Sequence, residues 1–328
     1  MAEFIIGNSL RTLARKNRWL QRILWRLDFA LVWCLVSLFR CLPVDLASRL
    51  GASVGRWVGP RMKRKHALYR ENFAIAFPEL NEVELDQLAT DAWGQAGRVL
   101  AEYPHLTTLL EDEQRLQIDI AEPVVTYSDP STPCVIVTAH QSNWEVIGTA
   151  MARMGIPNAT LYSPPTNPYL DKLLADSRRA LMCELLARDN SARLLMRALK
   201  QGRTAAMVMD RRVDEGDTVS FFGHQKMATT MPARLALKFK CDLVPVQVIR
   251  KKDASYRVIF HPPVKPRNPT ADDGSQALDL TQQVHDQFES WIKASPQDWF
   301  CSKRIWAKGV TQPPEDAGVS TDVDSYAA

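Results

Sequence analysis

The stretch CVIVTAHQSNWEVIG, residues 134–148, contains the clearest fold signal in the chain. Its apolar run, residues 134–137, follows a proline and is typical of a strand buried on both faces in an α/β sheet. Ser142 and Asn143 are residue types that often precede a helix, and an apolar helical pattern follows them. The stretch therefore predicts a buried strand, a turn that carries His140, and a helix.

A titratable pair lies at the end of this strand. Ligands of open α/β sheets bind beyond the carboxyl ends of the strands, where His140 is expected, and Glu145 follows five residues later. Residues five apart do not share a helical face, so His140 must lie on the turn and Glu145 in the first helical turn. A carboxylate against one imidazole nitrogen leaves the other free to take a proton. The spacing predicts a general base, His140, oriented by Glu145; the alternative is a capping box of Ser142 and Glu145 that needs no catalysis.

The setting of this pair resembles the H-x-x-x-x-E signature of the lysophospholipid acyltransferase superfamily. More specifically, it is similar to the bacterial late acyltransferases of lipid A synthesis, the lauroyl and myristoyl transferases. Further short matches occur in the family's order, over residues 20–308. They are Arg70-Glu71-Asn72-Phe73 with Ala76-Phe77-Pro78-Glu79, Asn167-Pro168 before Arg178-Arg179, Asp210, Phe221-Phe222-Gly223, Thr230-x-Pro232-Ala233, and Trp299 with Arg304-x-Trp306.

The resemblance implies an α/β fold with a mixed central sheet flanked by helices, as in lysophospholipid acyltransferases. It implies transfer of a fatty acyl chain from acyl-carrier protein, or acyl-CoA, to a hydroxyl of a lipid A precursor. His140 would take the hydroxyl proton and Glu145 would balance the imidazolium charge, without a metal or bound cofactor. The alternatives are another glycolipid or ornithine lipid as acceptor, or an inactive lipid-binding or scaffold protein with the same fold.

Several other residues are candidates for binding substrate. Arg178 or Arg179 could hold a phosphate or a carrier's phosphopantetheine, and Arg179 fits the family spacing better; a solvated helical face is the alternative. Asp210 ends a predicted strand on the ligand-binding side of the sheet, although a surface ion cluster would give the same pattern. Phe222 is predicted to form part of the acyl-chain wall. The full set of substrate-binding candidates is Asn143, Arg179, Asp210, Phe222, Gly223 and Thr230.

Two of these candidates also carry a backbone prediction. Gly223 is expected to let the backbone approach a ligand or adopt positive φ. Thr230 precedes Pro232 and is expected to cap the helix that follows, because proline fits the first helical turn.

Basic residues are concentrated near the N-terminus. Residues 1–70 hold 14 Lys and Arg against 3 Asp and Glu, whereas the whole chain has a net charge of only +4. Residues 10–26 mix arginines with Trp19 and Trp25, and the apolar segment 29–39 follows. A membrane span needs about 20 apolar residues, and here positive charge lies on both sides of the segment. We expect a helix that lies in, or dips into, the cytoplasmic face of the bacterial inner membrane; a buried helical hairpin is the alternative.

Other function classes have no support in the sequence. No aromatic-interleaved RNA motif, helix-turn-helix or zinc knuckle accompanies the basic region, so no nucleic-acid partner is predicted. The six cysteines are scattered without a C-x-x-C pair, which fits a reducing cytoplasm with neither a disulfide framework nor a zinc site. There is no Walker loop and no G-x-S-x-G motif.

The remaining pattern predicts three parts. A basic membrane-associated segment covers residues 1–45, an acyltransferase domain covers 46–310, and an acidic, proline-bearing tail at 311–328 is expected to be disordered. Within the domain, the predicted helices are 81–120, 170–183, 191–201, 233–240 and 279–294. The predicted strands are a short one within 123–133, 204–209, part of 216–223, and a hairpin of 242–251 with 256–264.

Overall fold

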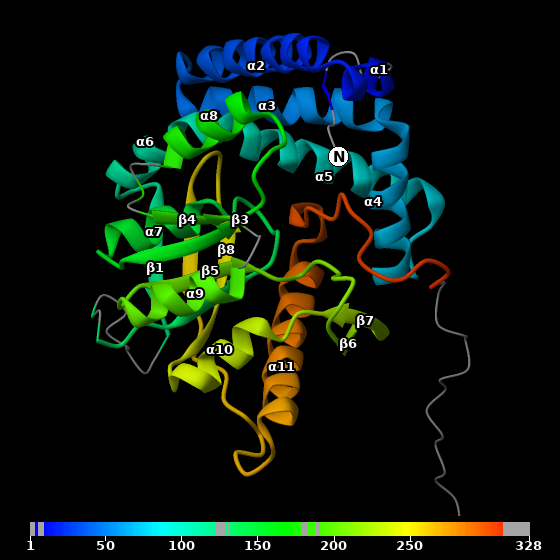
Figure 1. Cartoon of the computed structure of the whole chain (residues 1–328). Coiled ribbons are helices and arrows are strands. Elements are labelled where there is room, and N and C mark those ends of the chain that lie inside the picture. The colour runs from blue at the N-terminus through cyan, green and yellow to red at the C-terminus, as the bar shows by residue number, and fades with distance from the viewer. Residues whose placement is uncertain are drawn as a thin grey trace, which may run out of the picture.

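The computed structural model describes residues 4–5, 10–121, 129, 131–178, 181, 183–187 and 191–310. Within them, a seven-stranded sheet has the order β1-β9-β8-β2-β5-β3-β4 (Figure 1). Neighbouring strands are parallel except β8 and β9, which form an antiparallel hairpin. The fold is therefore α/β with a mixed central sheet, as expected. The strands are β1 (Leu116–Ile120), β2 (Val135–Thr138), β3 (Asn158–Tyr162), β4 (Cys183–Ala187), β5 (Thr204–Val208), β8 (Leu243–Arg250) and β9 (Tyr256–Phe260).

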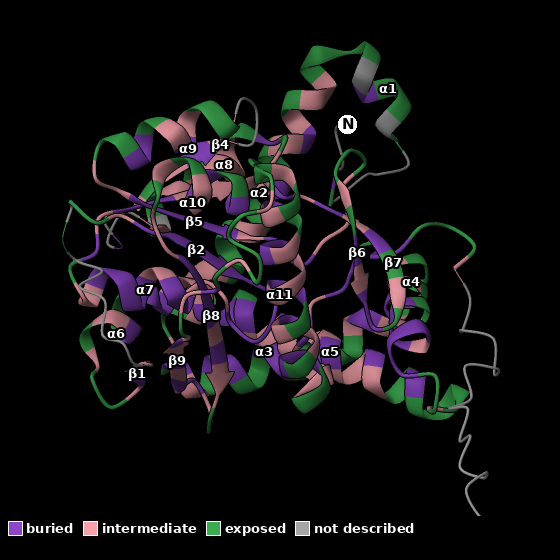
Figure 2. Ribbon diagram, turned by 90° about the horizontal axis from the view of Figure 1, so that it is seen from below, coloured by how far each residue is buried: buried purple, intermediate pink, exposed green. Residues whose placement is uncertain are grey.

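The predicted buried strand is β2, and all four of its residues are buried. Successive side chains of a strand point to opposite faces of the sheet. Accordingly, Val135 and Val137 belong to one hydrophobic core, whereas Ile136 belongs to a second core. Both faces of the sheet are covered by helices, and Figure 2 shows the buried residues gathered on the strands and on the inward sides of those helices.

Helices on the two faces complete these cores. The core of Ile136 includes α7 (Val146–Arg153), and α6 (Leu106–Glu111) packs on α7. The opposite core includes α9 (Ser191–Lys200), α10 (Met231–Phe239) and α11 (Asp273–Ala294). The same core extends to α4 (Lys63–Ala76), α5 (Glu82–Glu102) and the segment that follows η5 (Pro296–Asp298). A separate hairpin, β6 (Asp217–Phe221) with β7 (His224–Ala228), packs on α11.

The N-terminal helices lie together at one end of the molecule (Figure 1). They are α1 (Arg11–Lys16), α2 (Arg18–Arg40) and α3 (Val44–Val58). Gly51 and Gly97 let α3 and α5 approach closely, since a Cβ added at Gly51 would lie 2.4 Å from the carbonyl oxygen of Gly97. Among the described helices, none is long and apolar enough to cross a membrane.

Some predicted elements differ from the structure. The helix expected at 170–183 is α8 (Pro168–Arg178), and Cys183 starts β4 instead. The segment 81–120 is not one helix, because η3 (Tyr103–His105), α6 and β1 follow α5. Strands β1, β3, β4 and β7 were not predicted, and the segment of the short strand predicted within 123–133 lies largely outside the described residues. The hairpin of β8 and β9 and helix α9 are confirmed, while the tail at 311–328 lies outside the described residues.

Candidate active site

Two neighbouring strands bring His140 and Asp210 together. Strands β2 and β5 pair in parallel, so their carboxyl ends meet at one edge of the sheet. His140 follows β2 and Asp210 follows β5, each by two residues. The His140 Nδ1 atom lies 2.5 Å from Asp210 Oδ1, and the Asp210 side chain is completely buried. An acidic residue at the end of a strand is thus the orienting partner of the histidine.

Glu145 was predicted to orient His140, and this pairing is wrong. Its carboxylate binds Arg178 of α8 through two hydrogen bonds, one of them 3.0 Å long from Nε to Oε2. The alternative, a capping box of Ser142 and Glu145, is also absent among the described contacts: Glu145, not Ser142, is the N-cap of α7, and no side chain caps this helix. Ser142 has φ 54° and its amide bonds to the carbonyl of Asp298 at 2.8 Å, so the turn is held by the C-terminal segment.

The second oxygen of Asp210 and its backbone also have partners. The indole Nε1 of Trp299 donates to Asp210 Oδ2 at 3.0 Å. The ammonium of Lys226 donates to the backbone carbonyl of Asp210 and lies 3.0 Å from His285 Nε2. His285 Nδ1 in turn lies 2.8 Å from the carbonyl of Thr281. These contacts fix the carboxylate so that Oδ1 faces His140.

Electrostatics favour a neutral imidazole beside an ionised carboxylate. Burial lowers the pKa of His140 below its ordinary value, although the charge of Asp210 opposes this effect. Burial alone would raise the pKa of Asp210, but His140, Arg211 and Lys226 together hold that pKa below its ordinary value. At neutral pH the Nδ1–H of His140 therefore donates to Asp210, and Nε2 keeps its lone pair as a base.

Burial also perturbs the groups behind Asp210. It lowers the pKa of Lys226 to about 7, against the opposing attraction of Asp210. Burial and the neighbouring Lys226 lower the pKa of His285 to about 3. His285 is therefore neutral at pH 7.

His140 opens into a cavity of about 730 Å³, which is within the range of small-molecule binding sites. Most of its lining is apolar and comes from β2, α7, β3, β4 and β5. Charged side chains occupy another part of the lining. They are Arg178, Arg211, Arg212, Lys303 and Arg304, together with Glu145, Asp214 and Glu215. Such a cavity combines room for an aliphatic chain with groups that bind anions. Among the described residues, no three His, Cys, Asp or Glu side chains gather into a metal-binding group.

Several predicted substrate-binding residues lie elsewhere. Asn143 is buried and donates to Glu102 Oε2 at 2.9 Å, so it supports the fold beside the buried Glu102–Arg250 ion pair. Phe222 does not line the cavity; it stacks on Trp299 with ring centroids 5.8 Å apart. The predicted acyl-chain wall at Phe222 is therefore wrong, because the core aromatics cover it.

The structure also tests the backbone predictions for Gly223 and Thr230. A positive φ was one of the two alternatives predicted for Gly223, and this residue adopts φ +72°. Thr230 occupies the N-cap position of α10, but its hydroxyl donates to Asp217 Oδ2 at 2.7 Å instead of capping the helix. Arg179 lies outside the described residues, and its neighbour Arg178 is the arginine that lines the cavity.

Lys226 and His285 were not predicted as functional candidates. A lysine in a short strand and a histidine within a polar helix give no signal of burial. Trp299 was predicted only as part of a C-terminal motif. Its position in the sequence gives no indication that its indole donates to Asp210. For Asp210, the acidic residue at a strand's carboxyl end was the correct signal.

Comparison with known proteins decides the family. A sequence model of the bacterial lipid A biosynthesis acyltransferases matches residues 15–308. The chain belongs to this family. A lipid A biosynthesis acyltransferase of Haemophilus influenzae is 18% identical over 280 residues, which cover 84% of this chain and 85% of the relative.

Two Escherichia coli proteins are also similar to this lipid A acyltransferase family member. The lipid A biosynthesis lauroyltransferase is 25% identical over 246 residues, covering 72% of this chain and 78% of the relative. The lipid A biosynthesis palmitoleoyltransferase is 22% identical over 263 residues, covering 79% and 84%. The chain is accordingly an O-acyltransferase of lipid A biosynthesis, and the His140–Asp210 pair is its candidate active site.

Proposed function

We propose that this acyltransferase moves a fatty acyl chain from acyl-carrier protein, or acyl-CoA, to a hydroxyl of a lipid A precursor at the cytoplasmic face of the bacterial inner membrane. One observation carries the proposal. The His140–Asp210 pair faces a cavity whose lining is largely apolar but also includes five cationic side chains. An acyl chain suits the apolar part, and a phosphorylated substrate suits the cations.

The chemistry follows from the protonation states of this pair. His140 Nε2 takes the proton of the acceptor hydroxyl as the hydroxyl oxygen attacks the thioester carbonyl carbon. A carbon–oxygen bond forms, the carbon–sulfur bond breaks, and His140 returns the proton to the leaving thiolate. The products are an ester and a free thiol. Asp210 stabilises the imidazolium that exists between the two proton transfers.

Glu145 has a different role in this mechanism from the one its spacing suggested. It holds Arg178 in the cavity through the paired hydrogen bonds. The paired carboxylate balances the charge of Arg178 but fixes its guanidinium beside the reacting groups, and fixed N–H donors stabilise the oxyanion that forms during acyl transfer. The Glu145 carboxylate also raises the pKa of His140 through its charge, as a smaller contribution than that of Asp210.

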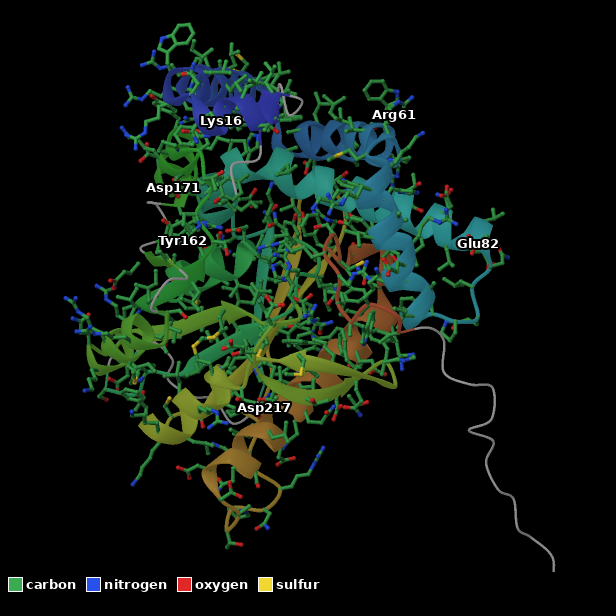
Figure 3. All side chains as sticks on the ribbon, turned by 45° about the vertical axis from the view of Figure 1, so that its right-hand side comes forward. Lys16, Arg61, Glu82, Tyr162, Asp171 and Asp217 are labelled. Carbon is green, nitrogen blue, oxygen red and sulfur yellow. The ribbon has the colours of Figure 1, made fainter. Side chains whose placement is uncertain are left out.

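Exposed apolar side chains on α2 and α3 support the membrane location. Trp19 and Trp57 are 70% and 62% exposed. The other large exposed apolar residues of the two helices are Leu27, Leu31, Trp33, Leu35, Leu38, Leu46, Leu50 and Val54. Lys16 and Arg61 lie at the same end of the molecule in Figure 3. Apolar residues flanked by cations are typical of helices that lie in the interface of an anionic membrane.

A vesicle assay tests this membrane surface. Leu35→Glu with Leu38→Glu should reduce binding to anionic phospholipid vesicles, because charged groups are costly to bury among acyl chains. Val83→Glu on α5 is the matched control, since Val83 is 78% exposed on a helix outside this surface. Equal vesicle binding by both variants would contradict the proposed location.

The acceptor is tested by mass spectrometry of lipid A from cells with and without the gene. We expect lipid A that lacks one secondary acyl chain when the gene is deleted, with recovery by the wild-type gene and not by His140→Ala. Unchanged lipid A with an altered glycolipid or ornithine lipid would instead favour the alternative acceptors. Recovery by His140→Ala would favour a lipid-binding or scaffold protein.

A further inference from the structure

A second hollow, of about 350 Å³, lies beside the active-site cavity. It is formed mainly by α9 and α10, with Ala192, Met196 and Leu235 as apolar lining. Glu215, Thr229 and Met231 line both this hollow and the cavity that contains His140. The two spaces therefore adjoin at these three residues.

Exposed cations surround this hollow, which we term the α9–α10 groove. Arg193 and Arg197 are exposed and are one helical turn apart on α9, directly after the lining residues Ala192 and Met196. Arg234 and Lys238 have the same spacing on α10, are exposed, and line the groove. Each helix thus presents two cations along one side of an apolar floor; two carboxylates lie among them, the exposed lining residue Glu215 and Asp217, which pairs with Arg234 at 3.5 Å.

The charge and the apolar surface here differ from those of α2 and α3. Among the described residues, no large apolar side chain of α9 or α10 is strongly exposed, so this surface lacks the apolar anchors of an interfacial helix. The groove also lies away from the end formed by α2 and α3 (Figure 1), and Asp217, which binds Arg234, lies far from Lys16 and Arg61 in Figure 3. A soluble anionic partner suits this surface better than a bilayer.

We infer that the α9–α10 groove is the docking surface for the acyl donor in its carrier-protein form, an acidic helical protein that bears the acyl chain on a phosphopantetheine arm. This inference rests on the proposed function and deepens it by placing the donor. Carboxylates of the carrier would face the cations of the two helices, and the arm would pass Thr229 and Met231 into the cavity. Donor and membrane-bound acceptor would then approach from different sides of the molecule.

Charge reversal on α9 tests the inference. Arg193→Glu with Arg197→Glu should raise the KM for acyl-carrier protein roughly tenfold or more at low ionic strength, because repulsion replaces attraction at the rim of the interface. The effect should shrink as salt is added. The maximal rate and the KM for detergent-solubilised acceptor should stay within about twofold, since neither side chain lines the cavity. Lys251→Glu with Lys252→Glu, two exposed positions after β8, is the matched control.

A binding measurement separates this inference from the proposed function. Titration of the wild-type protein and both double variants with apo-acyl-carrier protein requires no turnover. We expect weaker binding only for the α9 variant. If carrier binding and donor KM of the α9 variant equal those of the control, the docking inference is wrong even though acyl transfer continues. If the wild-type protein binds carrier at α9 but transfers no chain to a lipid A precursor, the proposed function fails and the docking site stands.

Discussion

Replacing Asp210 with asparagine keeps the shape of the side chain but removes the charge that faces His140 Nδ1 at 2.5 Å. The amide can place its NH₂ against Nδ1, which forces the proton onto Nε2 and removes the base. Where an asparagine replaces the orienting aspartate of a catalytic histidine, kcat falls by about 10⁴. We expect a loss of roughly 10³- to 10⁴-fold, which corresponds to about 4–5 kcal/mol of transition-state stabilisation.

The pH profile gives a second readout of the same variant. The reaction needs neutral His140, so kcat/KM falls as pH drops through the pKa of that residue, which burial holds below its ordinary value. The charge of Asp210 raises this pKa, so Asp210→Asn should lower it further. The acid limb of kcat/KM, measured from pH 4.5 to 8, should therefore move to lower pH.

Glu145→Gln is the discriminating control. It should weaken the contact with Arg178 and lower kcat less than Asp210→Asn does, with a smaller shift of the acid limb. Both variants should retain the wild-type circular dichroism spectrum. If Glu145→Gln moved the acid limb further than Asp210→Asn, or if Asp210→Asn lost less than tenfold in kcat, the assignment of Asp210 as the orienting residue would be refuted.

Three further changes test other parts of the structure. Trp299→Phe removes the indole donor to Asp210 and should lower kcat about tenfold with little change in KM in steady-state kinetics. A tenfold rise in KM with kcat unchanged would argue against a positioning role. Glu102→Gln breaks the buried pair with Arg250 and should cost about 3–5 kcal/mol in urea unfolding, whereas a loss below about 1 kcal/mol would contradict its burial. Leu185→Trp fills part of the active-site cavity and should disfavour the longest donors by roughly tenfold per two carbons, because each buried methylene contributes about 0.8 kcal/mol; an unchanged chain-length optimum would place the acyl chain elsewhere.

The sequence predicted the centre of the sheet because β2 and β5 are continuous apolar runs, which is how strands buried on both faces look. It also placed His140 and Asp210 at the carboxyl ends of those strands. The strands that it missed are less completely buried than β2 and β5. The segment 183–187 has one buried residue in five and continues an apolar pattern from α8, so its strand conformation depends on pairing with β3.

The partner of His140 could not be found from local spacing. Glu145 is five residues away in the chain, whereas Asp210 is seventy residues away, and only the parallel pairing of two strands makes Asp210 the closer carboxylate. The side-chain setting of Phe222 was misjudged for a similar reason. Its core position depends on Trp299, a residue that the sequence pattern does not connect to it.

The contact between Trp299 and Asp210 has a consequence for the order of events during synthesis. The backbone N–H of Phe300 also donates to the carbonyl of His140, at 2.7 Å. Two hydrogen bonds that hold His140 and Asp210 therefore come from residues translated after all seven strands of the sheet. A ribosome-bound chain that stops before position 299 could form α2, α3 and most of the sheet while Asp210 still lacks the donor that aims it. Trp299, Cys301, Ile305 and Trp306 are also fully buried in the core, so a chain that ends before position 299 lacks part of its core as well as the donor to Asp210.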